Sequence, residues 1–499
     1  MLYRTSNSSK VGLESWNSIS DCCTWYRVVC SPRSREITAL YLNDIPVPDF
    51  QNYLPDQTYM IWKNSKIFAP IYGIRSLMLL DISYNYMGGE ISGKELANLT
   101  KLVYLDISYN NFTGPIPEQL FHLRFLQTLD MTSNNFYGGL SNEVGKLGNL
   151  RSLKLDINLL EGNNPLQIGN LTKLVEFSIT ENKFSGGVPV SIGNLKRLEI
   201  LNLRKNHISM QIPSEIGRLS NLSTLVLSKN MFTGIIPPWI QNLSKLETLH
   251  LEDNMLSGDI PSFLFDMESL KNLYLGGNKL IWNNSAKIVP KCTLSELSLR
   301  SCKISLDIPE WISSQKILDI LELSDNQLTG KFPLWLAEME IGSILLSRNK
   351  LTGSIPSHLF QSKSLAVLDL SKNNFSRDLP ENIGDANKLV ALMLSGNNFS
   401  GPIPKSIEDL PKLNLLDLSR NRLSGNTFPV FDLDGRLTYI DLSFNDLSGD
   451  VPWSFSIETI VIALGNNKFS GKMPRNLSNL DSLPRISFPI ILPSSSKST

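Results

Sequence analysis

Apolar and polar positions alternate along this chain in a short pattern that recurs from one end to the other. The segment 102–110, Leu-Val-Tyr-Leu-Asp-Ile-Ser-Tyr-Asn, shows its form, L-x-x-L-x-L-x-x-N. The apolar residues five and three positions before the final Asn alternate with other residues, which is the period of a half-buried strand. Each copy therefore predicts one short strand that buries those two positions and exposes the positions six, four and two before the Asn.

The pattern repeats at a nearly constant spacing. Most copies end 24 residues after the previous one, with single steps of 25, 23 and 22. The 17 clear copies end at Asn85, Asn110, Asn134, Asn158, Asn182, Asn206, Asn230, Asn254, Asn278, Cys302, Asn326, Asn349, Asn373, Asn397, Asn421, Asn445 and Asn467. Residues 37–42 fit a degenerate eighteenth copy. A fixed period of about 20–29 residues with this pattern is the leucine-rich-repeat signature. The sequence thus predicts an α/β solenoid, a curved superhelix with a parallel sheet on its concave face.

Two recurrent features have structural explanations. The residue that ends each pattern, here called the ladder residue, lies where the chain leaves the strand, and an Asn amide can pair there with backbone groups of the turn. Cys302 replaces one ladder Asn, and we expect a buried thiol. A flank with Gly and Pro follows most ladder residues and predicts a short second strand, then a helical or 3₁₀ stretch. Four tryptophans follow such flanks and are predicted to pack the convex layer: Trp239, Trp311, Trp335 and Trp453.

Composition excludes several classes of protein. Lys and Arg number 47, Asp and Glu also number 47, and the formal net charge is zero, so no basic surface for nucleic acid is expected. Hydrophobic residues make up 41% of the chain, which excludes wholesale disorder. No apolar run approaches the ~18 residues needed to cross a bilayer. The first residues also lack the apolar core of a secretory signal. We therefore expect neither a membrane span nor an export signal within this chain.

The repeat and the N-terminal block resemble a known family. A 24-residue repeat with the flank L-[ST]-G-x-[IVFL]-P looks like the plant-specific class of leucine-rich repeats, and residues 16–30 resemble the N-terminal cap of plant receptor-like proteins and receptor-like kinases. The resemblance implies a disulfide between Cys23 and Cys30, and it leaves Cys22 without its upstream partner. It also implies a receptor ectodomain cut at both ends. The predicted organisation is a partial cap at 1–36, a degenerate first repeat with an insertion and the start of the second at 37–84, regular repeats at 85–480, and a non-repeat tail at 481–499.

The remaining cysteines and the sequons give further expectations. Cys292 and Cys302 flank a predicted strand, and the ~3.3 Å rise per residue holds them too far apart for a disulfide. Cys23 and Cys30 suit an oxidising compartment. Glycosylation sequons of the form N-x-[ST] support export, although some coincide with the repeat pattern. They occur at Asn7, Asn98, Asn111, Asn170, Asn221, Asn242, Asn283, Asn374, Asn398 and Asn476.

No catalytic motif is present in the sequence. The four histidines lie in different repeats, and there is neither an H-E-x-x-H motif nor a phosphate-binding glycine loop. The recurrent Asp and Ser four and two positions before the ladder Asn belong to the repeat. We therefore expect no enzyme activity, no cofactor and no metal site.

The exposed positions of the predicted concave sheet offer a binding surface instead. In the central repeats they depart from the generic Asp and Ser, and residues that break a repeat's rule without a folding reason are candidates for function. The alternative is that they are solvated surface residues under no constraint. The predicted ligand-binding residues are Lys154, Asp156, Glu176, Asn202, Arg204, Val226, His250, Glu252, Tyr274, Glu296 and Arg300.

The family resemblance then implies a function. The chain is predicted to be the ligand-sensing ectodomain of a plant cell-surface receptor-like protein in defence or development. It would bind an extracellular peptide, protein or glycan and act at the plasma membrane through a receptor kinase or SERK-type co-receptor. One alternative is a soluble apoplastic inhibitor of cell-wall-degrading enzymes, similar to polygalacturonase inhibitors. Another is a non-functional truncated remnant, because an open solenoid end exposes unpaired strand groups.

Overall fold

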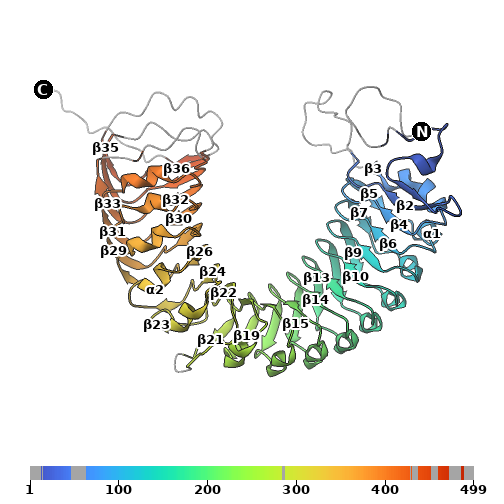
Figure 1. Ribbon diagram of the computed structural model, residues 1–499, viewed down its shortest axis with the longest axis horizontal. Coiled ribbons are helices and arrows are strands. Elements are labelled where there is room, and N and C mark those ends of the chain that lie inside the picture. Colours follow the sequence, from blue (N-terminus) through green and yellow to red (C-terminus); the bar gives the residue numbers. More distant parts are fainter. Residues whose placement is uncertain are drawn as a thin grey trace. The chain divides into compact units, whose positions relative to one another are not determined.

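A computed structural model describes residues 13, 15–45, 63–283, 287–426, 429, 436–450, 459–470 and 485–487. The chain divides into two compact units, Met1–Ser257 and Gly258–Thr499, which are described separately here. In each unit, short strands alternate with 3₁₀ helices (Figure 1). The predicted leucine-rich-repeat fold is therefore confirmed in both units.

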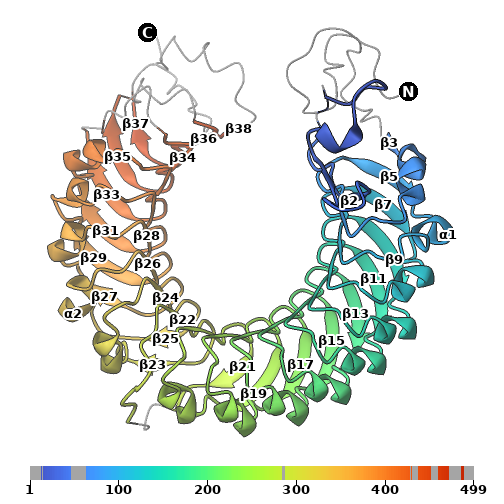
Figure 2. The ribbon, with the colours of Figure 1, turned by 45° about the vertical axis from the view of Figure 1, so that its right-hand side comes forward.

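The first unit contains a main sheet with one strand from each repeat. Consecutive repeat strands pair in parallel, while β1 pairs with β2 antiparallel. Figure 2 shows these strands on the inner side of the unit and the helices on its outer side. The strands are β1 (Val28–Cys30), β2 (Ile37–Tyr41), β4 (Leu79–Asp81), β6 (Tyr104–Asp106), β8 (Thr128–Asp130), β10 (Ser152–Lys154), β12 (Glu176–Ser178), β14 (Ile200–Asn202), β16 (Thr224–Val226) and β18 (Thr248–His250).

The flanks of the first unit form a second parallel sheet and the outer helices, as the Gly and Pro positions predicted. The second-sheet strands are β3 (Lys63–Asn64), β5 (Met87–Glu90), β7 (Asn111–Gly114), β9 (Asn135–Gly139), β11 (Leu159–Asn163), β13 (Lys183–Gly186), β15 (His207–Gln211), β17 (Met231–Gly234) and β19 (Met255–Asp259), within which the division between the units falls. The helices are η1 (Cys22–Thr24), η3 (Ser65–Gly73), α1 (Gly93–Leu96), η4 (Glu118–His122), η5 (Asn142–Lys146), η6 (Leu166–Asn170), η7 (Val190–Asn194), η8 (Ser214–Arg218) and η9 (Pro238–Asn242).

The second unit repeats this arrangement. Its main-sheet strands are β20 (Asn272–Tyr274), β22 (Glu296–Ser298), β24 (Ile320–Glu322), β26 (Ser343–Leu345), β28 (Val367–Asp369), β30 (Ala391–Met393), β32 (Leu415–Asp417), β34 (Tyr439–Asp441), β36 (Val461–Ala463) and β38 (Arg485–Ser487). Its second-sheet strands are β21 (Lys279–Ile281), β23 (Ser305–Leu306), β25 (Gln327–Leu328), β27 (Thr352–Gly353), β29 (Asn374–Asp378), β31 (Asn398–Gly401), β33 (Arg422–Gly425), β35 (Asp446–Gly449) and β37 (Lys468–Phe469). Its helices are η10 (Ser262–Asp266), η11 (Glu310–Ser314), α2 (Leu334–Ala337), η12 (Ser357–Gln361), η13 (Ile383–Asp385) and η14 (Lys405–Asp409).

The segment 481–499 and the insertion in the first repeat differ in how they compare with the predicted organisation. Strand β38 lies inside the segment 481–499, for which the sequence predicted no repeat, yet it pairs in parallel with β36. The main sheet of the second unit therefore extends by one strand into that segment. The predicted insertion in the first repeat includes residues 46–62, which lie outside the described residues.

The ladder asparagines hold neighbouring repeats together through their side-chain amides. Asn230, which is 8% exposed, donates from Nδ2 to the carbonyl oxygens of Leu203, Leu227 and Ser228 at 2.9, 3.1 and 3.1 Å. Its Oδ1 accepts from the backbone N–H of Ile208 at 3.0 Å. Because these backbone groups are buried by the stacking of repeats, the side chain adds hydrogen bonds to groups that water does not reach. This confirms the structural interpretation of the ladder.

The recurrent Asp and Ser also serve the turn. Asp106 Oδ1 accepts hydrogen bonds from the backbone N–H and the hydroxyl of Ser108 at 2.9 and 2.7 Å. The same pair of contacts joins Asp417 to Ser419 at 3.0 and 2.7 Å. These carboxylates therefore close the turn after the strands that carry them, which agrees with their assignment to the repeat rather than to catalysis.

Candidate ligand-binding site

The predicted ligand-binding residues lie in main-sheet strands or two positions after them. Eight belong to the first unit and three to the second. The parallel register places Asn202, Val226 and His250 in one row across β14, β16 and β18. A second row runs two residues further along each strand, through Arg204, Ser228 and Glu252. Backbone N–H groups of Lys205 and Lys229 donate to the Ser228 and Glu252 carbonyls, both at 2.9 Å, and fix this second row.

Three of the predicted residues are already paired with one another or with neighbours. Lys154 Nζ lies 3.2 Å from Glu176 Oε1, and the Ser152 hydroxyl donates to Glu176 Oε2 at 2.8 Å. Burial lowers the pKa of Lys154, but Glu176 and the nearby aspartates raise that pKa by more. Asp156 accepts hydrogen bonds from the hydroxyl of Ser178 and the backbone N–H of Thr180. The charged side chains in this part of the surface are therefore already paired with neighbouring groups of the protein.

The Arg204 row is different, because three of its polar atoms are buried without a hydrogen-bond partner. Arg204 Nε, Ser228 Oγ and Glu252 Oε2 each lack a hydrogen-bond partner of good geometry within the described residues, although the Ser228 hydroxyl lies close enough to the Glu252 carboxyl to lower its pKa. Ser228 is 0% exposed, and its neighbour Val226 is 8% exposed. Buried polar atoms are nearly always hydrogen-bonded, so three on adjacent strands at one level of the sheet require an explanation. The site offers one donor, one acceptor and a hydroxyl that can do either.

Burial and Arg204 set the charges around this row. They lower the pKa of His250 to about 4, so the imidazole is neutral near pH 7. Burial also raises the pKa of Glu252, and hydrogen bonding, including that of the Ser228 hydroxyl, and the positive charge of Arg204 oppose that shift. Near neutral pH the row therefore holds one guanidinium and one carboxylate beside a neutral imidazole and an apolar Val226.

In the second unit, the predicted residues contact acidic partners. The Tyr274 hydroxyl donates to Glu296 Oε2 at 2.8 Å. Arg300 Nε lies 3.8 Å from Glu322 Oε1, and Ser298 donates to Glu322 Oε2 at 2.6 Å. The structure thus joins Tyr274 to Glu296 across β20 and β22 and brings Arg300 towards β24.

Two residues of these clusters were missing from the sequence prediction. Ser228 was taken as a generic repeat Ser, and Glu322 was not selected although it replaces the generic Asp. A signal for Ser228 existed, because it lies 24 residues from both Arg204 and Glu252 and so falls between two departures from the pattern. A departure at Glu322 was visible in the same way.

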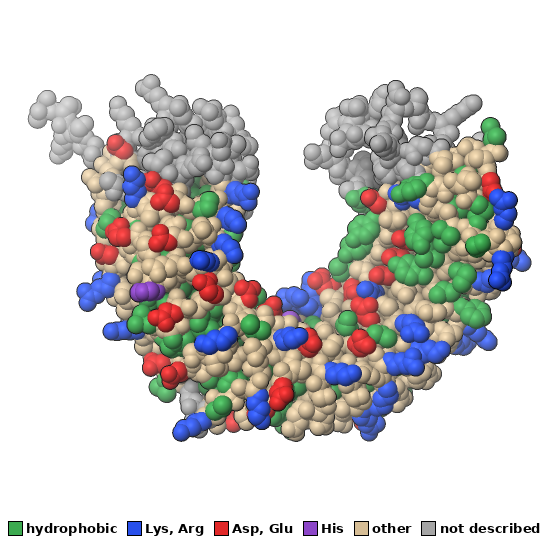
Figure 3. All heavy atoms as spheres, viewed as in Figure 1, with side chains coloured by type: hydrophobic (Ala, Val, Ile, Leu, Met, Phe, Trp, Pro, Cys, Tyr) green, Lys and Arg blue, Asp and Glu red, His purple; other side chains and the backbone are tan. Residues whose placement is uncertain are grey.

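An aromatic surface near the start of the first unit was also not predicted. Hydrophobic side chains gather over its first main-sheet strands (Figure 3). Tyr84 and Tyr109 stack there with ring centroids 4.1 Å apart, and they are 51% and 43% exposed. The Tyr104 hydroxyl donates to Asp106 Oδ2 at 3.2 Å beside them. These contacts are satisfied within the sheet, so we assign this surface no ligand.

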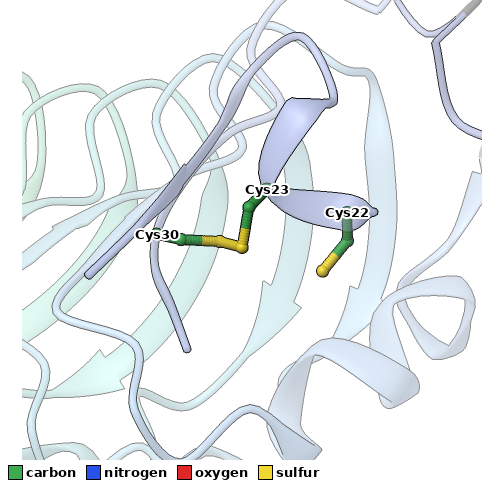
Figure 4. Close-up of side chains that lie close together, drawn as sticks. All are labelled: Cys22, Cys23 and Cys30. Atoms are coloured by element: carbon green, nitrogen blue, oxygen red, sulfur yellow. A yellow bond between two sulfur atoms is a disulfide. The ribbon is translucent and has the colours of Figure 1, made fainter. Parts of the chain in front are cut away.

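The cysteines of the N-terminal block lie close together (Figure 4). Cys23 and Cys30 form a disulfide, and Cys22 is a free, half-buried thiol. The three Sγ atoms lie within 4.8 Å of one another, but two of them belong to the disulfide and cannot bind a metal as thiolates. Cys292 and Cys302 are both buried and free, as their predicted separation required.

The predicted glycosylation sites differ in exposure. Asn7 and Asn476 lie outside the described residues. Asn111, Asn221 and Asn398 are half-buried, and five are exposed: Asn98, Asn170, Asn242, Asn283 and Asn374. Use of these sites stays a prediction. Within the described residues no helix has the length and hydropathy of a membrane span.

Comparison with known families agrees with the repeat. The leucine-rich-repeat region family matches residues 58–186. Two further leucine-rich-repeat families match residues 220–280 and 363–423, and residues 197–219, 293–315 and 436–456. Receptor-like protein 46 of Arabidopsis thaliana is 46% identical over 113 residues, which cover 22% of this chain and 12% of that protein.

The chain is a leucine-rich-repeat protein and is similar to plant receptor-like proteins. Receptor-like protein 9b of Arabidopsis thaliana is a further relative, 39% identical over 69 residues that cover 13% of this chain and 7% of that protein. The matched segments thus span only about a tenth of these relatives' length.

Solved structures of plant receptor ectodomains match over nearly the whole of this chain. The ectodomain of the Arabidopsis thaliana receptor kinase GASSHO1/SCHENGEN3, in complex with CASPARIAN STRIP INTEGRITY FACTOR 2, is 30% identical with a TM-score of 0.71 and matches 95% of this chain and 61% of its own. The Arabidopsis receptor kinase HAESA, in complex with the peptide hormone IDA and the co-receptor SERK1, is 27% identical with a TM-score of 0.64 and matches 95% of this chain and 85% of its own.

Proposed function

We propose that this chain is a ligand-sensing ectodomain and that its ligand binds the main-sheet face of the first unit at Arg204, Ser228 and Glu252. The observation that carries the proposal is the row of buried polar atoms without partners on that face. Leaving such atoms unpaired costs about 1–3 kcal/mol each, and a bound ligand that pairs them recovers this cost. A row on neighbouring strands would therefore contribute both affinity and specificity.

The chemistry of the row favours a peptide in extended conformation. A peptide group offers a carbonyl to the Arg204 Nε–H and an N–H to the Glu252 carboxylate, and the Ser228 hydroxyl can accept from one or donate to the other. Val226 gives the row an apolar neighbour for a ligand side chain. The complex of HAESA with the peptide hormone IDA supports a ligand of this class.

We further propose that the ligand signal passes to a partner receptor kinase or SERK-type co-receptor on the extracellular side of the plasma membrane, in defence or development. The complex of HAESA with SERK1 supports this kind of partner. In this proposal the chain binds and presents its ligand and carries out no chemical step.

A peptide-display selection tests the proposal. The probe is a random peptide library displayed on phage, selected against the secreted chain, with affinities of the enriched peptides measured by calorimetry. Arg204→Ala should weaken binding at least ~10-fold, equal to ~1.4 kcal/mol. The matched control is Arg218→Ala, which removes an exposed arginine from η8 on the outer side. If no peptide is enriched, or if Arg204→Ala binds the enriched peptides as well as Arg218→Ala does, the proposal fails.

A further inference from the structure

The second unit contains a cavity of about 730 Å³ on the side of its second sheet and outer helices. Three tryptophans lie in its wall, one after β21, one in η11 and one in α2, and three charged side chains lie beside them. These residues are Trp282, Trp311, Trp335, Asp307, Glu310 and Lys331. Trp311 and Trp335 are half-buried, so the packing role predicted for them accounts for only part of their surface.

The cavity arises where the flank pattern fails. The repeat after Asn278 continues with Leu280-Ile281-Trp282-Asn283 in place of the usual flank with Gly and Pro, and within the described residues the second sheet is interrupted between β21 and β23. In the next repeat Leu306 stands where the flank Gly belongs, with φ 68° and 65% exposure. Met210 and Arg377 take the same left-handed conformation at this flank position, so the backbone follows the repeat, and what distinguishes Leu306 is its exposed apolar side chain beside the cavity.

The cavity wall has the chemistry of a saccharide site. The ring of Trp282 is buried and stacks on that of Trp311 with centroids 6.1 Å apart, so the half-buried Trp311 and Trp335 supply the exposed aromatic surface of the wall. The Trp311 indole N–H is buried without a partner within the described residues. A pyranose has C–H faces that pack on aromatic rings and hydroxyls that need donors and acceptors at its edge. The exposed side chains of Asp307, Glu310 and Lys331 supply both. The volume lies in the usual range of ligand pockets.

A predicted glycan attachment site lies directly beside this wall. Asn283 follows Trp282, so their Cα atoms are about 3.8 Å apart. Asn283 is exposed and begins the sequon Asn-Asn-Ser. We propose that the N-linked glycan of Asn283 docks into the tryptophan cavity of its own chain. A tethered sugar binds at an effective concentration in the millimolar range, so weak stacking contacts suffice.

The inference rests on the extracellular part of the proposed function, because N-glycans are added in the secretory pathway. In the attachment step, Asn283 Nδ2 forms a bond to C1 of the first N-acetylglucosamine. A lipid pyrophosphate leaves from that carbon, and the amide loses one proton. The docked glycan then covers the exposed Leu306 and gives the Trp311 N–H an acceptor.

Enzymatic release of the glycans tests the docking. The secreted chain is treated under native conditions with peptide-N-glycosidase F, and release at each sequon is followed by glycopeptide mass spectrometry. Because the enzyme acts on the undocked glycan, release at Asn283 should be about tenfold slower than at the exposed Asn170. Trp335→Ala should remove this difference. The control Trp239→Ala, at the equivalent flank position of the first unit, should leave it unchanged.

A second variant separates loss of glycan docking from misfolding of the tryptophan variant. The double variant Asp307→Asn and Glu310→Gln keeps the side-chain shapes and should also speed release at Asn283 with an unchanged melting temperature. Equal release at Asn283 and Asn170 in the wild type, or no effect of both cavity variants, overturns the docking. Glycans at other sequons with none at Asn283 overturn it too and leave the proposed function intact. No glycan at any sequon counts instead against the extracellular placement.

Binding of free chitobiose distinguishes the chain's own glycan from an external saccharide. Asn283→Gln should leave the cavity open, so that chitobiose changes the tryptophan fluorescence of this variant. The glycosylated wild type should respond far less. An equal response of the two proteins would mean that the cavity takes free saccharides and would overturn the assignment to the Asn283 glycan.

Discussion

His250 Nδ1 lies 3.7 Å from Glu252 Oε1, yet these two groups do not form an ion pair near neutral pH. The imidazole is neutral because burial and the charge of Arg204 lower its pKa to about 4. The negative charge of Glu252 is therefore not neutralised by the nearest ring. It remains available to a ligand that approaches the row from the exposed side of the sheet.

The depressed pKa of His250 predicts a pH-dependent stability. The unfolded state binds a proton near pH 6.5 and the folded state only near pH 4, so the free energy of unfolding falls as the pH drops through this window. His250→Gln should lack this loss, which we expect to be about 1–3 kcal/mol after solvent screening. Urea unfolding of both proteins between pH 4 and 7 measures it. A stability difference that does not change with pH would refute the assignment.

The paired and unpaired parts of the main-sheet face should differ in ligand binding. Lys154 is already joined to Glu176, whereas Glu252 has an oxygen without a partner. Lys154→Ala should change the affinity for a selected peptide by less than about threefold, while Glu252→Gln should weaken it at least ~10-fold. Calorimetry on both variants measures the ratio. A larger effect of Lys154→Ala would place the ligand nearer to β10.

Removing a ladder amide should destabilise the first unit more than any surface change. Asn230→Ala leaves the Ile208 N–H without its 3.0 Å acceptor and removes one of the hydrogen bonds that each of three carbonyls accepts. We expect a loss of about 2–4 kcal/mol, because one buried backbone N–H is left unpaired and the hydrogen bonds to three carbonyls are lost. Lys229→Ala, next to it and exposed, should change stability by less than ~0.5 kcal/mol. Chemical unfolding followed by circular dichroism compares the two, and equal stabilities would contradict the role of the ladder.

The free cysteines should react at different rates. Burial raises the pKa of Cys292 to about 11 and that of Cys302 to about 12, so neither is a thiolate near neutral pH. Iodoacetamide at pH 8 should modify the half-buried Cys22 in the native protein and reach the other two only after unfolding. Mass spectrometry of the digested protein measures the extent of alkylation at each cysteine. Native modification of Cys302 at the rate of Cys22 would show that its repeat opens readily.

Most of the fold could be predicted because each repeat places the same side chain in the same environment. The buried position of Leu201, the turn after it and the amide of Asn206 all follow from neighbours within one repeat. Ser228 was missed because its environment comes from residues 24 positions away on each side. Within its own repeat, Ser228 is the residue that the pattern leads one to expect at that position.

The tryptophan cavity was not predicted for a related reason. It depends on two consecutive flanks that depart from the pattern, one before Asn283 and one at Leu306. Each of these departures, taken alone, looks like ordinary sequence variation between repeats and does not predict a cavity. Only the spatial stacking of the repeats brings Trp282, Trp311 and Trp335 to one cavity.

Hydrogen–deuterium exchange shows where on the first unit a selected peptide binds. The secreted chain is compared with and without a selected peptide at saturating concentration. If the peptide binds at Arg204, Ser228 and Glu252, we expect slower exchange in β14, β16 and β18 and in the turns that follow them, where these residues lie. Exchange in η7, η8 and η9 should stay the same. Protection confined to those outer helices, with none in the three strands, would contradict the account.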